Sequence, residues 1–159
     1  MKCKMTVSIK DVVPGFDIDN GENLLILPEN YYDKKGYRYY ESSISFYKYA
    51  KDKLNIDFIE SPKVLLEQRS GDWFGPVIFV SSLALTNNPV LISIATGVIA
   101  NYLTDFFKGT KEPDVDVKII YKETLKSKYT EIHYKGGSNG LSELNDAIKK
   151  IAGPDNNEE

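Results

Sequence analysis

The sequence predicts an α+β fold: a mainly antiparallel sheet with a central apolar helix pair and a C-terminal β-hairpin followed by a helix. Three observations predict it. Segments near both ends alternate apolar and polar residues with the period of two that marks half-buried strands. Other segments repeat apolar residues every three or four positions, as amphipathic helices do. Between them, residues 73–107 carry a single formal charge, at Asp105, which is typical of elements buried on all sides.

Alternation predicts the principal strands. Residues 3–10 alternate strictly, and so do residues 114–121 and 129–135, whose polar connection indicates a β-hairpin. The run at 24–27 is apolar throughout and indicates a short buried strand. Further short strands are expected on either side of the Ser61-Pro62 pair.

Four helices are expected, over residues 41–54, 76–86, 89–107 and 141–151. The first and last have an apolar stripe at helical spacing. Pro76 and Pro89 suit a first helical turn, where the missing N–H costs nothing, so the apolar stretch is interpreted as two helices. Their short connection predicts an antiparallel pair in contact.

Small side chains recur at every fourth position of the second apolar helix and predict a close helix–helix contact. They are Ser93, Gly97 and Asn101. Gly97→Leu is then expected to cost about 1–3 kcal/mol through overpacking. The helix pair is buried in this chain, forms a homo-oligomer interface, or inserts into a membrane as a hairpin, and the flanking charges do not decide between these alternatives.

The whole-chain composition predicts one domain over residues 1–153 and an acidic, disordered tail at 154–159. The net charge is −3, from 20 basic and 23 acidic residues, which argues against binding nucleic acid over a broad basic surface. The single cysteine, and the lack of an apolar signal-peptide core after the basic N-terminus, favour the cytoplasm. Membrane insertion of the helix pair would instead place the chain on the cytoplasmic face of a membrane.

No catalytic residue, metal site or cofactor is predicted. His133 is the only histidine, and no nucleophile can be assigned to it from spacing. One cysteine and one histidine at opposite ends do not form a usual zinc ligand set. The stretch from Asp17 to Gly21 fits an Asx-rich turn, because Pro28 stands where a calcium loop needs its bidentate glutamate. The glycine-rich residues 136–140 lack the Lys-Ser/Thr ending of a phosphate loop.

Seven of the eleven tyrosines lie between Tyr31 and Tyr49. Residues 31–53 hold six basic and three acidic side chains, a local charge of +3. Such a segment can cover the edge of the core, form a protein interface, or stack on nucleic-acid bases. We take the first part of it, with the only tryptophan, as candidate partner-binding residues: Tyr31, Tyr32, Tyr37, Arg38, Tyr39, Tyr40 and Trp73.

The lack of catalytic machinery and the excess of apolar helix predict a non-catalytic interaction or regulatory module. It would act through protein–protein contacts, by self-association or with a partner protein. Three alternatives stay open: a small membrane-associated protein that inserts residues 76–107, a nucleic-acid binder through residues 31–53, and a small enzyme of unknown reaction. The enzyme would use scattered carboxylates such as Glu60, Glu67 and Asp72.

One stretch of the chain carries a resemblance. The run from Arg69 to Gly109, with the segments RSGDWFGP, NNP and IANYLTDFFKG, resembles proteins of an uncharacterised bacterial family with no assigned function. The run covers about a quarter of the chain. The resemblance implies a bacterial origin and carries no activity or functional residue with it.

Overall fold

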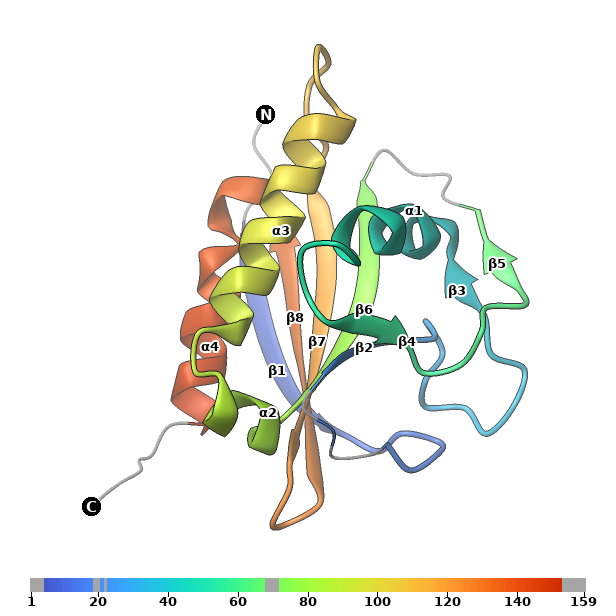
Figure 1. Cartoon of the computed structure of the whole chain (residues 1–159), viewed down its shortest axis with the longest axis vertical. Coiled ribbons are helices and arrows are strands. Elements are labelled where there is room, and N and C mark those ends of the chain that lie inside the picture. The colour runs from blue at the N-terminus through green and yellow to red at the C-terminus, as the bar shows by residue number, and fades with distance from the viewer. Residues whose placement is uncertain (1–4, 19–20, 22, 68–71, 153–159) are drawn as a thin grey trace.

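The computed structural model describes residues 5–18, 21, 23–67 and 72–152. The chain forms a six-stranded mixed sheet with helices packed on one of its faces, so the predicted α+β class is confirmed (Figure 1). A second, two-stranded sheet pairs β3 with β5. The strands are β1 (Thr6–Val12), β2 (Leu24–Leu27), β3 (Tyr39–Tyr40), β4 (Ile56–Phe58), β5 (Leu65–Leu66), β6 (Trp73–Ser81), β7 (Val115–Glu123) and β8 (Lys128–Gly136). The helices are α1 (Glu41–Ala50), α2 (Ser82–Asn87), α3 (Leu91–Phe106), the short η1 (Ser138–Gly140) and α4 (Ser142–Ala152).

The strand order in the large sheet is β1-β8-β7-β6-β2-β4. The β1–β8, β8–β7 and β6–β2 pairs are antiparallel, whereas β6–β7 and β2–β4 are parallel. The predicted strands at both ends, the C-terminal hairpin and the helices at 41–54, 89–107 and 141–151 are confirmed, with bounds shifted by a few residues. Helices α3 and α4 lie side by side over β7 and β8, and α1 lies over β6 (Figure 1).

The predicted helix at 76–86 is wrong, because Trp73–Ser81 is the strand β6 and only Ser82–Asn87 is helical. β6 has neighbours on both sides and is buried on both faces, so it is apolar at almost every position. Pro76 lies where the β6–β7 register shifts, a place at which a strand tolerates a missing N–H. There is therefore no central helix pair; α3 belongs to the crossover that joins the parallel strands β6 and β7.

Ser93, Gly97 and Asn101 lie on the exposed side of α3, so the predicted close packing along this stripe is wrong within the chain. A Cβ at Gly97 would have no neighbouring atom within 4 Å. The helix turns its larger side chains to the sheet instead, and the buried ones include Ile92, Ile99 and Leu103. None of the helices in the described part of the chain is both long and apolar enough to cross a membrane. The predicted tail at 154–159 lies outside the described residues.

The two faces of the sheet are covered differently. The helix face carries the main core, to which β6, β7, β8 and all four α-helices contribute buried side chains. On the opposite face a smaller core covers only part of the sheet, and it is closed by residues from the two loops that flank β2. Its buried members are Ile18, Leu27, Tyr31, Val77, Phe79 and Ile120. The rest of that face, on β1, β7 and β8, holds the candidate site.

Candidate interaction surface

Three neighbouring strands, β7, β8 and β1, present polar side chains on the face opposite the helices. Residues that are partners in the strand register lie side by side, so these side chains form rows across the sheet. One row joins Asp116, Lys135 and Thr6, and the next joins Lys118, His133 and Ser8. Each of these side chains is exposed or half-buried. We call this region the open face and define it as Thr6, Ser8, Lys10, Asp116, Lys118, His133 and Lys135.

His133 is fixed on the open face by a carboxylate. Its Nε2 lies 2.7 Å from Asp116 Oδ1, and because a carboxylate can only accept, the imidazole donates. Ser8 stands opposite His133 in the register, so serine, histidine and aspartate occupy three adjacent strands. Within the described residues no hydrogen bond joins Ser8 to His133, so the geometry shows no activated nucleophile. Asp116 was not among the predicted site residues. The predicted hairpin nevertheless puts Asp116 and Lys118, two residues apart, on the polar face of one strand and His133 on the polar face of the other.

Glu131 links the open face to the loop after β2. Tyr31 donates its hydroxyl proton to Glu131 Oε1 at 2.6 Å, and Lys10 Nζ lies 3.7 Å from Glu131 Oε2. Burial raises the pKa of Tyr31, and the hydrogen bond to Glu131 raises it further. Tyr31 is 1% exposed, so it is a core residue that anchors the loop and not a partner contact as predicted.

Next to the Tyr31–Glu131 hydrogen bond, the loop after β2 and the strand β3 carry two further candidate tyrosines and an arginine. Tyr32 is 53% exposed and packs edge-on against Tyr31, with ring centroids 5.4 Å apart. Tyr40 is half-buried against Phe74, at 5.3 Å. Burial raises the pKa of Tyr40 to about 12, and the negative charges of Glu29 and Asp116 add to the shift.

Arg38 is the third candidate residue at this edge. Its Nε donates to Glu29 Oε2 at 2.9 Å, and its side chain remains 40% exposed. The Arg38 charge lowers the pKa of Tyr40, against the larger effects of burial and of the negative charges. Tyr32, Arg38 and Tyr40 therefore stay candidate partner-binding residues.

The other predicted candidates lie elsewhere. Tyr37 is half-buried, packs at 5.1 Å against Phe16 and donates to the Asp33 carbonyl. Tyr39 points to the helix side, is 1% exposed and donates to the Glu60 carbonyl at 3.1 Å. Trp73 is 3% exposed, between Phe46 of α1 and Tyr102 of α3. Tyr39 and Trp73 are therefore corrected from partner contacts to core residues.

On and around the open face, the basic side chains are more exposed to solvent than the acidic ones. The side chains of Glu29, Asp116 and Glu131 are only 15%, 14% and 7% exposed, and each has a partner. In contrast, the side chain of Lys10 is 68% exposed, and Lys135 is also exposed. Counting Lys10, Lys118 and Lys135 against Asp116 and Glu131 gives three positive and two negative charges, or +1. The surface therefore presents cations and tyrosines outward and keeps its carboxylates within.

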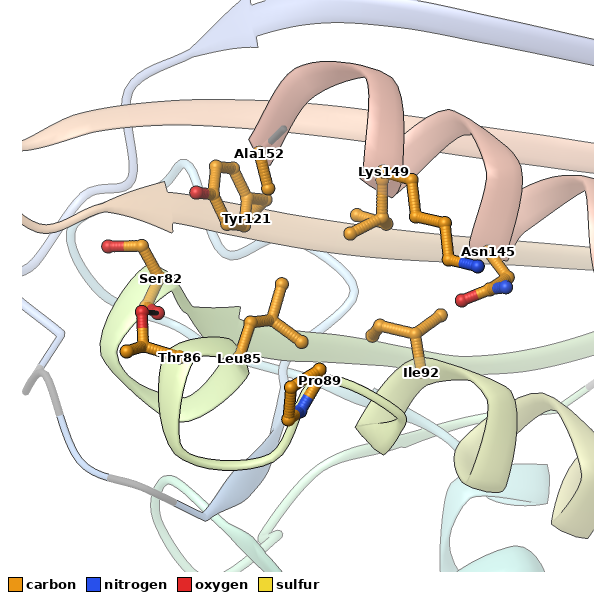
Figure 2. A pocket seen from close by; sticks show the side chains of 10 residues that line it. Ser82, Leu85, Thr86, Pro89, Ile92, Tyr121, Asn145, Lys149 and Ala152 are labelled. Carbon is orange, nitrogen blue, oxygen red and sulfur yellow. Dashed lines mark hydrogen bonds between the residues drawn. The ribbon is translucent and has the colours of Figure 1, made fainter. Parts of the chain in front are cut away.

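A hollow lies on the helix side of the molecule, between α2, the start of α3, α4 and β7. It encloses about 420 Å³. Figure 2 shows Leu85, Pro89 and Ile92 on one wall and Asn145 and Lys149 of α4 on the other. Its lining mixes these apolar side chains with polar ones, which also include Ser82 and Thr86, and nothing in the structure indicates what would fill it. We therefore do not take this groove as the candidate site.

Comparison with known proteins gives no relative for the chain: no family model, curated protein or solved structure matches it. Among the residues that the structure describes, no group of three or more His, Cys, Asp or Glu side chains could hold a metal ion. The chemistry of the open face is therefore the starting point for a functional proposal.

Proposed function

We propose that the chain is a non-catalytic protein-interaction module that binds an acidic segment of a partner protein on the open face. The supporting observation is the charge arrangement, with exposed lysines around carboxylates that are largely buried and already paired. Complementary charge steers association and selects among partners. A face built on three paired strands is also preorganised, which lowers the entropy cost of binding.

The neighbouring tyrosines and arginine supply the anchors that charge alone lacks. Tyrosine and arginine are enriched among residues that dominate binding energy. Tyr32 offers an exposed ring with a polar tip. Arg38 uses its Nε on Glu29 and keeps further donors of its fork for a partner carboxylate. The proposed contact thus combines an aromatic anchor at the edge with a cationic strip on the sheet.

The test uses a short fluorescein-labelled oligoglutamate peptide as the probe, with binding followed by fluorescence anisotropy. Lys10→Glu and Lys135→Glu should each weaken binding, on the order of tenfold, and added salt should weaken it further. Lys150→Glu is the matched control, because Lys150 is an exposed lysine on α4, away from the open face.

Three outcomes would overturn this proposal. The first is no saturable binding of the peptide. The second is an equal loss of affinity in Lys150→Glu, which would show attraction to the whole molecule instead of to this face. The third is preferential binding of a single-stranded thymidine oligonucleotide, which would reassign the face to nucleic acid.

Self-association is a second candidate function, favoured by the outer edge of β1. This strand ends the sheet order and has seven residues, with Met5 and Val13 exposed beside it and Ile9 51% exposed. An unpaired edge of this length is a template for another strand. A twofold axis through Ile9 would pair two copies antiparallel, with Val7 facing Asp11 and Ser8 facing Lys10 of the second copy.

Size-exclusion chromatography with light scattering tests the second candidate. The unmodified chain should elute as a dimer, near twice 18.0 kDa, and Ile9→Lys should convert it to a monomer. Val90→Lys should leave the dimer intact, because Val90 is 55% exposed at the start of α3, far along the chain from β1. A monomeric unmodified chain would exclude self-association through β1.

A further inference from the structure

A buried lysine lies on the same face of the sheet as the open face, but at the opposite, covered end of β7. Lys122 is 9% exposed. Its Nζ donates to the Ile18 carbonyl at 3.0 Å and lies 5.4 Å from the ring centroid of Tyr129. An ammonium group has three N–H donors, so one carbonyl leaves two of them unused. In the described part of the chain, Lys122 makes no ion pair with a carboxylate.

This arrangement leaves a buried positive charge undercompensated. Removing an ammonium from water is costly unless it is paired and hydrogen-bonded. A carbonyl dipole and the face of an aromatic ring offset only part of that cost. A ligand that brings a carboxylate to the ammonium would supply the missing charge and accept the unused donors.

Beside Lys122 is a cavity of about 810 Å³, open to solvent, that could admit such a ligand. Residues from the loop before β2, from β2 and β4 and from the β7–β8 turn line it. Asp17 and Asp57 are part of this lining, and both are exposed. An apolar wall is formed by Leu25, Phe58 and Ile59.

Among the residues that the structure describes, the lining offers a cation, two carboxylates and an apolar wall together. A simple anion would pair with Lys122 but would face two negative side chains. A simple amine would pair with Asp17 or Asp57 but would leave Lys122 without a counter-ion. A ligand with both charges can pair with Lys122 and with one of the two carboxylates at the same time.

We propose that this cavity binds a small zwitterion of the amino-acid class, a free amino acid or a short peptide with apolar side chains. The carboxylate pairs with Lys122 Nζ, the ammonium pairs with Asp17 or Asp57, and the side chain packs on the apolar wall. This site is separate from the open face and does not depend on the interaction proposed there.

Isothermal titration calorimetry with the full chain tests the proposal, with L-leucine and dileucine as probes. The two probes share both charged groups but separate them by different lengths, so they distinguish a free amino acid from a peptide. Isocaproate lacks the ammonium of leucine and isopentylamine lacks the carboxylate. At least one zwitterion should bind, and both single-charge analogues should bind on the order of tenfold more weakly, the equivalent of one charge-assisted hydrogen bond.

Matched variants locate the binding. Lys122→Met keeps most of the length of the side chain and removes its charge, and it should abolish zwitterion binding. Lys150→Met, at an exposed lysine on α4, should not change it. Asp57→Asn changes an exposed residue and so gives a folded variant even if Lys122→Met fails to fold. The double substitution of Asp17 and Asp57 by Asn should remove the preference for zwitterions over isocaproate.

The proposal is overturned if neither L-leucine nor dileucine binds. It is also overturned if Lys150→Met and Lys122→Met lose affinity equally, because binding would then not depend on the buried ammonium. Isocaproate binding as tightly as leucine would show a plain anion site and reject the zwitterion. An undiminished preference for zwitterions in the double Asp variant would reject the assigned role of the two carboxylates.

Discussion

At the scale of single residues, two glycines differ in what surrounds them. A Cβ at Gly75 would lie 2.5 Å from Trp73 Cζ3 and 3.1 Å from Val117 Cγ2, whereas a Cβ at Gly97 would meet no atom within 4 Å. Gly75 is also buried, in the central strand β6. The absence of a side chain at Gly75 therefore makes room for the indole, and at Gly97 it serves no packing purpose.

Alanine substitution at both glycines should consequently change stability in opposite directions. Gly75→Ala should lower the free energy of unfolding by about 1–3 kcal/mol, because the indole cannot move without disturbing α1 and α3. Gly97→Ala should raise it by about 0.5–1 kcal/mol, because alanine is the better helix former at an exposed position. Urea denaturation of both variants checks this, and a loss at Gly97 would mean that this side of α3 is covered.

Buried tyrosines make the protein sensitive to alkali. Burial raises the pKa of Tyr39 to about 12, and the charge of Glu60 adds to the shift; the ordinary tyrosine pKa is about 10. The unfolded chain therefore loses this proton at lower pH than the folded chain does. The contribution to stability is complete below pH 10 and is lost as the pH rises to about 12.

Tyr39→Phe should flatten this alkaline loss of stability. The variant should be less stable at neutral pH by about 1 kcal/mol, because the hydroxyl hydrogen bond to Glu60 is lost. Its free energy of unfolding should then fall less steeply than that of the unmodified chain between pH 10 and pH 12. Denaturant titrations across this range measure the slopes, and parallel curves would contradict the buried phenol.

The tyrosine-rich segment shows how far sequence reasoning reaches at this scale. Composition located the segment, in which Tyr32, Arg38 and Tyr40 are exposed or half-buried, whereas Tyr31 and Tyr39 are buried. It could not separate Tyr39 from Tyr40, because neighbours on a strand point to opposite faces and the direction of burial depends on the fold. Asp116 is a partner of His133 only through the registry of β7 and β8, which spacing within one segment does not show.

At the scale of elements, the boundary between β6 and α2 is where the sequence was least informative. A strand buried on both faces and a buried helix are both continuous apolar runs, so periodicity does not distinguish them. Pro76 is compatible with a helix start and with an irregular strand. The amphipathic elements were predicted correctly because each has one solvent-exposed face, whereas β6 has no such face.

The chain marks this boundary with a buried serine. Ser81 ends β6, and its Oγ accepts from the Ala84 N–H at 3.1 Å while donating to the Gly21 carbonyl at 3.0 Å. It is therefore both the N-cap of α2 and a link to the segment before β2. A hydroxyl with two partners in the core is hard to replace.

Ser81→Ala should lower the free energy of unfolding by about 1–2 kcal/mol, because the cap and the link are lost together. Ser93→Ala is the control, since Ser93 is an exposed serine within α3 and alanine favours a helix. Urea denaturation compares the two. If Ser81→Ala is no more harmful than Ser93→Ala, the cap does not contribute to stability.

At the scale of the whole molecule, one sheet separates two unequal cores. The helix side is covered by α1, α3 and α4, and the opposite side is covered only at one end, by loops. The open face and the zwitterion cavity both lie on the side without helices, where polar side chains on β7 and β8 have no helix above them. The arrangement gives rigid strands on which exposed chemistry can be displayed.

This architecture predicts a gradient of stability from the middle of the sheet to its edges. β6 and β7 have neighbours on both sides and are buried on both faces along much of their length, whereas β1 and β4 are edge strands. Amides that open only in global unfolding should lie in β6, β7 and β8. Native-state hydrogen exchange should therefore be slowest there and faster in β1 and β4.

Native-state hydrogen exchange at two protein concentrations tests whether a second copy of the chain pairs with β1. An unpaired edge leaves alternate N–H groups of β1 to water, so its exchange should be fast and independent of concentration in a monomer. Pairing with a second copy would protect those amides, and only those, as the concentration rises. Protection of β1 equal to that of β6 at every concentration would contradict the sheet order, because an edge strand of a single chain cannot be protected as completely as a central one.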